Sequence, residues 1–259
     1  MAYSLNEAKA LIIQAGRELV KQKLVARTWG NISARISDTE FVITPSGVPY
    51  DQVNENNLVV VNIRDCSYQG NIKPSGEKKV HAAVYRLRSD VNFILHTHQN
   101  YATAVSVDEI DKDFAPVAKY ALPGTKRLVK NVEEVLERNL SKDTFLLARH
   151  GALVLSKNYE DAFTKVVILE NRAKQLFDKV ASNKTPEEEA RPYLDDYAQM
   201  FGNKNQAMED DQEALEMVRY KNTLAARYQR KLHPMKKLDV FLQHLVYQKK
   251  YSKLKDKNK

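Results

Sequence analysis

Apolar positions near the start of the chain recur at the helical period of about 3.6 residues. The residues of this stripe are Leu5, Ala8, Leu11, Ile12, Ala15 and Leu19. Ser4 and Glu7 have the spacing of a capping box, in which each side chain satisfies a backbone N–H group at a helix start. The pattern therefore predicts a first helix that ends near Lys23.

Shorter apolar runs follow, separated by Gly, Pro, Asn and Asp, and they indicate strands. Expected strands cover 32–36, 40–44, 58–63 and 91–98, with two more inside 144–156. Expected helices cover 80–88, 99–107, 132–139 and 159–180. The alternation lacks the glycine fingerprint of a dinucleotide-binding fold, so it predicts an α/β protein with a central mixed or antiparallel sheet flanked by helices.

The segment 183–192 (NKTPEEEARP) interrupts the pattern and predicts a boundary. We expect a catalytic domain over 1–182 and a helical, basic C-terminal extension over 183–259. Most of the net charge of +8 belongs to residues 204–259 within this extension, which carry 14 Lys and Arg against 7 Asp and Glu. The preceding part is nearly neutral, so we do not expect a nucleic-acid partner.

Composition narrows the class of protein further. With 43% hydrophobic and 29% charged residues the chain can form a buried core. It has no apolar stretch near the length of about 20 residues that spans a bilayer and no signal-peptide pattern. A single cysteine cannot form an internal disulfide. We therefore expect a cytoplasmic protein with no membrane partner.

Two histidines provide the clearest chemical signal. His96 and His98 end an apolar strand, and residues two apart in a strand share one face, so both imidazoles can reach one ion. We expect His150 to end a second strand, FLLARH, and Glu77 lies in a polar turn before a helix. Three imidazoles and one carboxylate suit a divalent ion such as Zn²⁺. The alternative is a set of structural, hydrogen-bonded histidines. His81 competes for the site, and for it we expect a supporting or structural role.

Three small polar turns accompany these residues. They are Trp29-Gly30-Asn31, Thr44-Pro45-Ser46-Gly47 and Pro74-Ser75-Gly76. Serine and glycine in such turns expose hydroxyl and backbone N–H groups that can hold a phosphate, although each turn alone is also ordinary turn chemistry.

In order and spacing, these motifs resemble class II aldolases of the fuculose-phosphate aldolase and ribulose-phosphate 4-epimerase type, the aldolase/adducin family. The resemblance spans about residues 5–180 and is carried by Gly30-Asn31-Ile32-Ser33-Ala34-Arg35, Ile43-Thr44-Pro45-Ser46-Gly47, Pro74-Ser75-Gly76-Glu77 with His81, His96-Thr97-His98, Pro123-Gly124-Thr125, Leu146-Leu147-Ala148-Arg149-His150-Gly151, and Glu160-Asp161-Ala162-Phe163 with Glu170.

This resemblance implies a three-layer αβα fold with a mostly antiparallel sheet, and a homotetramer with sites at subunit interfaces. It implies zinc bound by His96, His98, His150 and, at rest, Glu77. It also implies a substrate phosphate held by Gly30, Asn31, Ser46, Gly47, Ser75 and Gly76. The expected reaction is reversible aldol cleavage of a ketose 1-phosphate to dihydroxyacetone phosphate and an aldehyde, with Glu77 as the proton-transferring catalytic residue.

Two departures from the family pattern leave other reactions open. Gly76 stands where the family usually has a second serine, and the tyrosine that protonates substrate in the aldolases has no match, with Tyr101 and Tyr120 as candidates by proximity. The alternatives are a sugar-phosphate 4-epimerase, a methylthioribulose-phosphate dehydratase or a decarboxylase on the same metal core. Outside this group stand a non-catalytic adducin-type binding head, which needs no metal ligands, and a zinc hydrolase, which needs no phosphate turns.

Overall fold

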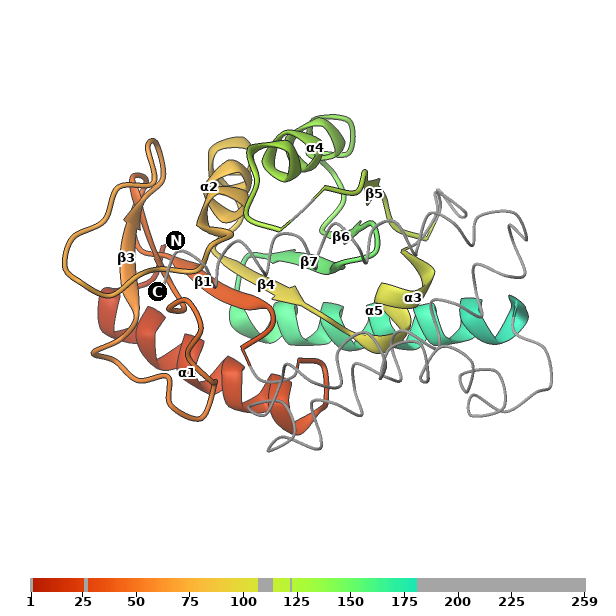
Figure 1. Ribbon diagram of the computed structural model, residues 1–259, viewed down its shortest axis with the longest axis horizontal. Helices are drawn as coiled ribbons and strands as arrows, with labels where there is room; N and C mark the ends of the chain where they lie inside the picture. The colour runs from red at the N-terminus through yellow and green to blue at the C-terminus, as the bar shows by residue number, and fades with distance from the viewer. Residues whose placement is uncertain (1, 26–27, 107–113, 122, 181–259) are drawn as a thin grey trace, which may run out of the picture.

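The computed structural model describes residues 2–25, 28–106, 114–121 and 123–180 (Figure 1). The helices of this part are α1 (Leu5–Lys21), α2 (Lys78–Leu87), α3 (Asn100–Val105), α4 (Lys126–Glu137) and α5 (Tyr159–Val180). The strands are β1 (Asn31–Arg35), β2 (Glu40–Ile43), β3 (Val59–Asn62), β4 (Phe93–Thr97), β5 (Val117–Ala118), β6 (Thr144–Leu147) and β7 (Gly151–Ser156). The expected extension over 183–259 lies outside the described residues.

The described strands form one seven-stranded sheet in the order β3-β2-β1-β4-β7-β6-β5. Neighbouring strands of this sheet are antiparallel except β5 and β6, which are parallel. The predicted mostly antiparallel sheet is therefore confirmed. Strand β4 is its central member, paired with β1 on one side and β7 on the other.

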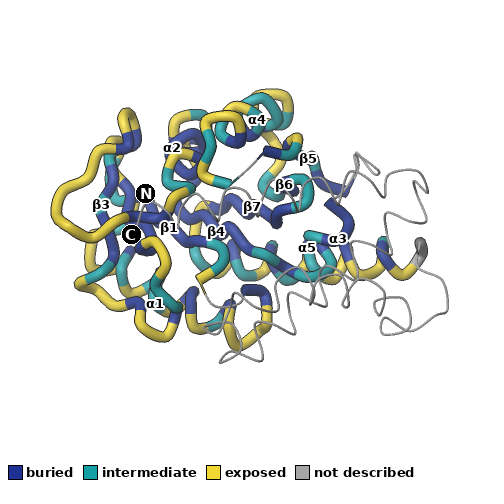
Figure 2. The backbone as a smooth tube through the Cα atoms, in the orientation of Figure 1, coloured by how far each residue is buried: buried dark blue, intermediate teal, exposed yellow. Residues whose placement is uncertain are grey.

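Helices cover both faces of the sheet (Figure 1). Phe93 and Leu95 of β4 pack in the core that α1 and α5 cover, whereas Ile94, between them, packs in the core that α2 and α4 cover. This division follows from the strand period of two, which sends successive side chains to opposite faces. Figure 2 shows the buried strands between partly exposed helices. The three-layer αβα fold is thus confirmed.

Two elements differ from the expectation. Helix α4 begins at Lys126 rather than near Val132, because the Thr125 side chain caps it by accepting the Leu128 N–H at 3.3 Å. Strand β5 was not predicted, because two residues carry no periodic pattern and its pairing partner, β6, lies far along the chain. Among the described helices, none combines the length and the apolar character needed to cross a membrane.

Candidate metal centre and phosphate loops

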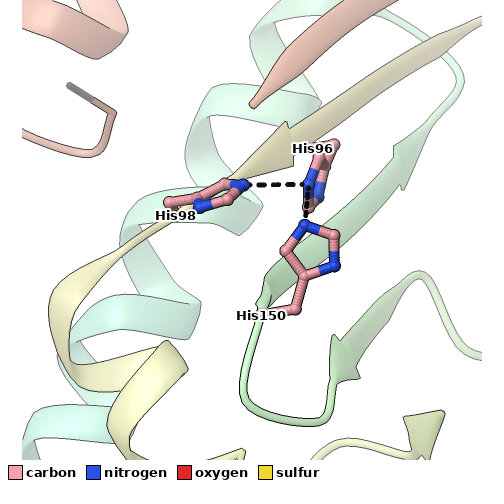
Figure 3. Close-up of side chains that lie close together, drawn as sticks. All are labelled: His96, His98 and His150. Carbon is pink, nitrogen blue, oxygen red and sulfur yellow. Dashed lines mark hydrogen bonds between the residues drawn. The ribbon is translucent and has the colours of Figure 1, made fainter. Parts of the chain in front are cut away.

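The end of β4 presents the two histidines that the spacing pointed to. His96 lies within the strand and is buried, and His98 follows one residue after the strand ends. Their Nε2 atoms lie 3.2 Å apart. Figure 3 shows both rings converging, so the expected shared face is confirmed for this pair.

The third imidazole comes from the turn between β6 and β7. His150 was expected to end a strand, but β6 stops at Leu147, which pairs with Gly151. The tight turn between them is closed by the His150 N–H donating to the Leu147 carbonyl at 3.0 Å, and Arg149 adopts a φ of 58°. The turn places the His150 Nε2 atom 3.2 Å from the His96 Nε2 atom (Figure 3).

The hydrogen bonding of His96 turns its second ring nitrogen toward the other two histidines. The His96 Nδ1 atom lies 2.9 Å from the Ala152 carbonyl oxygen, which can only accept a hydrogen bond. A neutral His96 therefore carries its hydrogen on Nδ1 and presents the Nε2 lone pair to the other two histidines. One ring nitrogen from each of His96, His98 and His150 lies within 4.8 Å of the others. Three nitrogen donors in this arrangement suit zinc.

Glu77 brings a carboxylate to the same point from the N-terminal end of α2. Its Oε2 atom lies 3.1 Å from the His96 Nε2 atom, and its Oε1 atom lies 3.5 Å from the His150 Nε2 atom. Within the described residues, Oε1 is buried and has no hydrogen-bond partner. A buried carboxylate oxygen without a donor costs free energy unless a cation lies beside it. The residues present therefore fit a metal ion with Glu77 as an oxygen ligand.

The surroundings of Glu77 keep it ionised. Burial raises the pKa of its carboxyl. His150 and His96, together with a hydrogen bond from the Asn31 amide, lower the pKa by more than burial raises it. The net effect is a pKa below the ordinary value for glutamate. Asn31 Nδ2 donates to Glu77 Oε2 at 3.0 Å. The carboxylate is therefore ionised and available as a ligand to a cation.

His81 stays apart from the three clustered histidines. It is fully buried on α2, and its Nε2 atom lies 2.5 Å from the Asn31 Oδ1 atom. Burial lowers the pKa of His81, the neighbouring His96 lowers it as well, and Glu77 opposes the shift, so that the net pKa is about 3. His81 is therefore neutral, and its contact with Asn31 agrees with the supporting role expected for it.

Two glycines allow the neighbouring strands to approach the end of β4. A Cβ atom on Gly30, whose φ is 76°, would lie 2.4 Å from the His96 carbonyl oxygen. A Cβ atom on Gly151 would lie 2.2 Å from the Thr97 carbonyl oxygen. Sequence reasoning assigned Gly30 to phosphate binding and gave Gly151 no role. The structure shows that both positions exclude a side chain.

The other two polar turns lie side by side. An isolated bridge joins Pro45 and Pro74, the Ser46 N–H donates to the Lys73 carbonyl at 2.8 Å, and the Ser75 N–H donates to the Thr44 carbonyl at 3.0 Å. These two N–H groups are therefore used within the protein. A Cβ atom on Gly47 or Gly76 would meet no atom within 4 Å, so both glycines border open space.

Tyr101, one candidate for the proton donor, has its ring packed edge-on against Phe177 of α5, with centroids 5.7 Å apart. Tyr120, the other, lies just before α4, where its carbonyl accepts a hydrogen bond from Asn131. The assignment of a proton donor to either tyrosine stays a prediction.

Comparison with known proteins gives a consistent picture. The family model described as Class II Aldolase and Adducin N-terminal domain matches residues 10–177. A 3-oxo-tetronate 4-phosphate decarboxylase of Haemophilus influenzae is 30% identical over 185 residues, covering 65% of this chain and 86% of the relative. An L-fuculose phosphate aldolase of Methanocaldococcus jannaschii is 30% identical over 176 residues, covering 64% of this chain and 93% of the relative. A solved structure of L-fuculose 1-phosphate aldolase superposes with a TM-score of 0.59 at 31% identity, covering 67% of this chain and 85% of that one.

Proposed function

Because the chain belongs to the class II aldolase and adducin family, we propose that it is a zinc-dependent sugar-phosphate lyase. It would cleave a ketose 1-phosphate reversibly to dihydroxyacetone phosphate and an aldehyde. The observation that carries this proposal is the convergence of the ring nitrogens of His96, His98 and His150 with the Glu77 carboxylate.

A divalent cation held by these groups would polarise the substrate carbonyl and stabilise the negative charge that develops on oxygen as the carbon–carbon bond breaks. Glu77 is the proposed general base and acid, because its ionised carboxylate can exchange a proton with the substrate hydroxyl and carbon. Its second oxygen stays held by the Asn31 amide. The three histidines would hold the ion while Glu77 gains or loses a proton.

For the substrate phosphate we propose a cradle of Gly30, Asn31, Ser46, Gly47, Ser75 and Gly76. The neighbouring loops and the open space beside Gly47 and Gly76 support it. Since the Ser46 and Ser75 N–H groups are already engaged, the serine hydroxyls and the glycine N–H groups are the proposed donors. Asn31 has a second amide hydrogen that could serve the phosphate while the first serves Glu77.

Three further proposals stand beside this one. The resemblance supports a homotetramer, the break in pattern at 183–192 supports a catalytic domain over 1–182, and the composition supports a cytoplasmic location. A relative named as a 3-oxo-tetronate 4-phosphate decarboxylase supports decarboxylation as a second candidate reaction. The relatives compared above are named as enzymes, so the adducin-type binding head gains no support from them.

Product analysis tests the proposal. The zinc-loaded protein is incubated separately with a panel of ketose 1-phosphates, a pentulose 5-phosphate and 3-oxo-tetronate 4-phosphate. Dihydroxyacetone phosphate formed together with an aldehyde is the expected result. Carbon dioxide from the tetronate alone would assign the decarboxylase, and an isomeric pentulose phosphate alone would assign the epimerase.

A further inference from the structure

A hydrogen-bonded network of buried polar side chains leads from the interior of the molecule to Glu77. Tyr85 and Ser33 begin it, with their hydroxyl oxygens 2.8 Å apart, and Ser33 Oγ lies 2.6 Å from His81 Nδ1. His81 Nε2 contacts Asn31 Oδ1, whose amide nitrogen reaches Glu77. Tyr85, Ser33, His81 and Asn31 are each at most 4% exposed, so none exchanges these contacts for water.

The direction of every hydrogen bond in this network follows from the group at its end, the Glu77 carboxylate. The Glu77 carboxylate can only accept, so the Asn31 amide turns its NH₂ toward Glu77 and its oxygen toward His81. That oxygen can also only accept, so His81 carries a hydrogen on Nε2. Neutral His81 then has a bare Nδ1 atom that accepts the single hydroxyl hydrogen of Ser33.

Once the Ser33 hydrogen is committed to His81, the Ser33 oxygen accepts the hydroxyl of Tyr85. Each donor therefore points toward the carboxylate. Reversing one bond would place two acceptors or two donors in contact, which buried groups avoid because no water is present to compensate.

We propose that Ser33 and His81 are positioning residues that fix the orientation of the Asn31 amide and, through it, the rotamer of Glu77. Asn31 Nδ2 holds the Oε2 oxygen, which leaves Oε1 directed toward His150. This inference rests on the proposed function only for its consequence in turnover. The hydrogen-bond directions themselves depend on the described contacts alone.

Nitrogen-15 NMR of the zinc-loaded full chain tests the directions without any substrate. The His81 signals are assigned by their loss in His81→Gln. We expect a protonated Nε2 and a bare Nδ1 on His81 at neutral pH. A hydrogen on His81 Nδ1, in either a neutral or a charged ring, would overturn the proposal.

Ser33→Ala removes the donor to His81 Nδ1 without touching Asn31 or Glu77. We expect an Nδ1-protonated form of His81 to become populated and kcat to fall, while zinc content stays within about twofold of the parent. Ser156→Ala is the matched control, since Ser156 is a buried serine of β7 that donates to Asp161 at 2.7 Å and pairs with the opposite end of β4. It should change neither the His81 signals nor kcat.

Replacement of His81 completes the test. His81→Leu should lower kcat by about 10–100-fold, the range for groups that orient a ligand. His81→Gln should recover most of this loss, because its amide N–H can reach the position of Nε2. Equal kcat values for the two variants would contradict the proposal, as would a zinc loss that accounts for the whole effect. If His81→Leu does not fold, Ser33→Ala and the NMR result still decide the matter.

The two proposals fail in different ways. A zinc-loaded protein that cleaves no ketose phosphate but keeps the expected His81 tautomer would contradict the lyase proposal alone. An active lyase with a hydrogen on His81 Nδ1 would contradict the positioning proposal alone.

Discussion

Each of the three clustered imidazoles offers one ring nitrogen to a common point, so the loss of one leaves two nitrogen ligands and a carboxylate. We predict that His98→Ala loses most of its zinc and its turnover together, measured as zinc per chain and as kcat. His244→Ala, a histidine outside the family match, is the control and should keep both. Full turnover in a metal-free preparation would contradict the proposed metal centre.

Glu77 has a different proposed role from the histidines, because it transfers a proton as well as binding the ion. Glu77→Gln keeps the shape of the side chain and leaves all three histidines in place, but it removes the group proposed to move the proton. We predict that the variant retains much of its zinc and loses turnover by about 10²–10⁴-fold, as general acid–base groups do. Glu133→Gln, in an exposed ion pair with Arg86 on the outer helices, should keep full turnover. Unchanged kcat in Glu77→Gln would move the proton transfer to another group.

What could be predicted at this scale depended on local spacing. The His96 and His98 pair was visible because a strand period of two places both on one face. The orientation of the Asn31 amide was not, because it is set by His81 and Glu77, which lie far from Asn31 along the chain. The close approach at Gly151 was likewise hidden, because the atom it would strike belongs to another strand.

At the level of elements, the site depends on how closely β7 packs against β4. Gly151→Ala would place a Cβ atom 2.2 Å from the Thr97 carbonyl oxygen, a backbone atom that cannot move away cheaply. We predict a loss of about 1–3 kcal/mol in the free energy of unfolding, typical of overpacking, measured by chemical denaturation of the zinc-free protein.

Gly76→Ala is the matched control, since a Cβ atom there meets nothing within 4 Å. Its free energy of unfolding should change by less than about 0.5 kcal/mol, as for a substitution without contacts. Equal losses in the two glycine variants would show that the close approach at Gly151 is not the cause.

Elements with a repeated pattern were predicted well, and those fixed by distant partners were not. Helix α5 has the bounds that its periodicity indicated, 159–180. The two-residue β5 exists through its pairing with β6, and the tight turn that carries His150 depends on the pairing of β6 with β7. Neither pairing can be predicted from a pattern of neighbouring residues in the sequence.

For the whole molecule, the motifs were sufficient to identify the family and its three-layer fold, because they extend over most of the matched residues. The family and the enzyme class expected from them are confirmed by the family match and by relatives named as aldolases. The individual substrate could not be predicted, since the recognised motifs concern only the proposed metal and phosphate sites.

The described site residues all precede Gly151, whereas the excess of positive charge follows residue 203. Deleting 251–259 removes four lysines and one aspartate, a net charge of +3. We predict that the truncated protein keeps its zinc, its oligomeric state and its kcat, measured by metal analysis, light scattering and turnover. Loss of turnover in a folded truncated protein would instead assign this segment a part in the active site.

The four groups of the proposed metal centre come from the start of α2, the end of β4 and the turn between β6 and β7. An unfolded chain separates them, so an ion that binds all four binds the native state preferentially. Mass action then adds about 2.7 kcal/mol to the stability when the free ion is at 100 times its dissociation constant. If the proposed centre binds zinc, the resistance of this fold to unfolding is partly a property of the surrounding solution, rising and falling with the supply of the free ion.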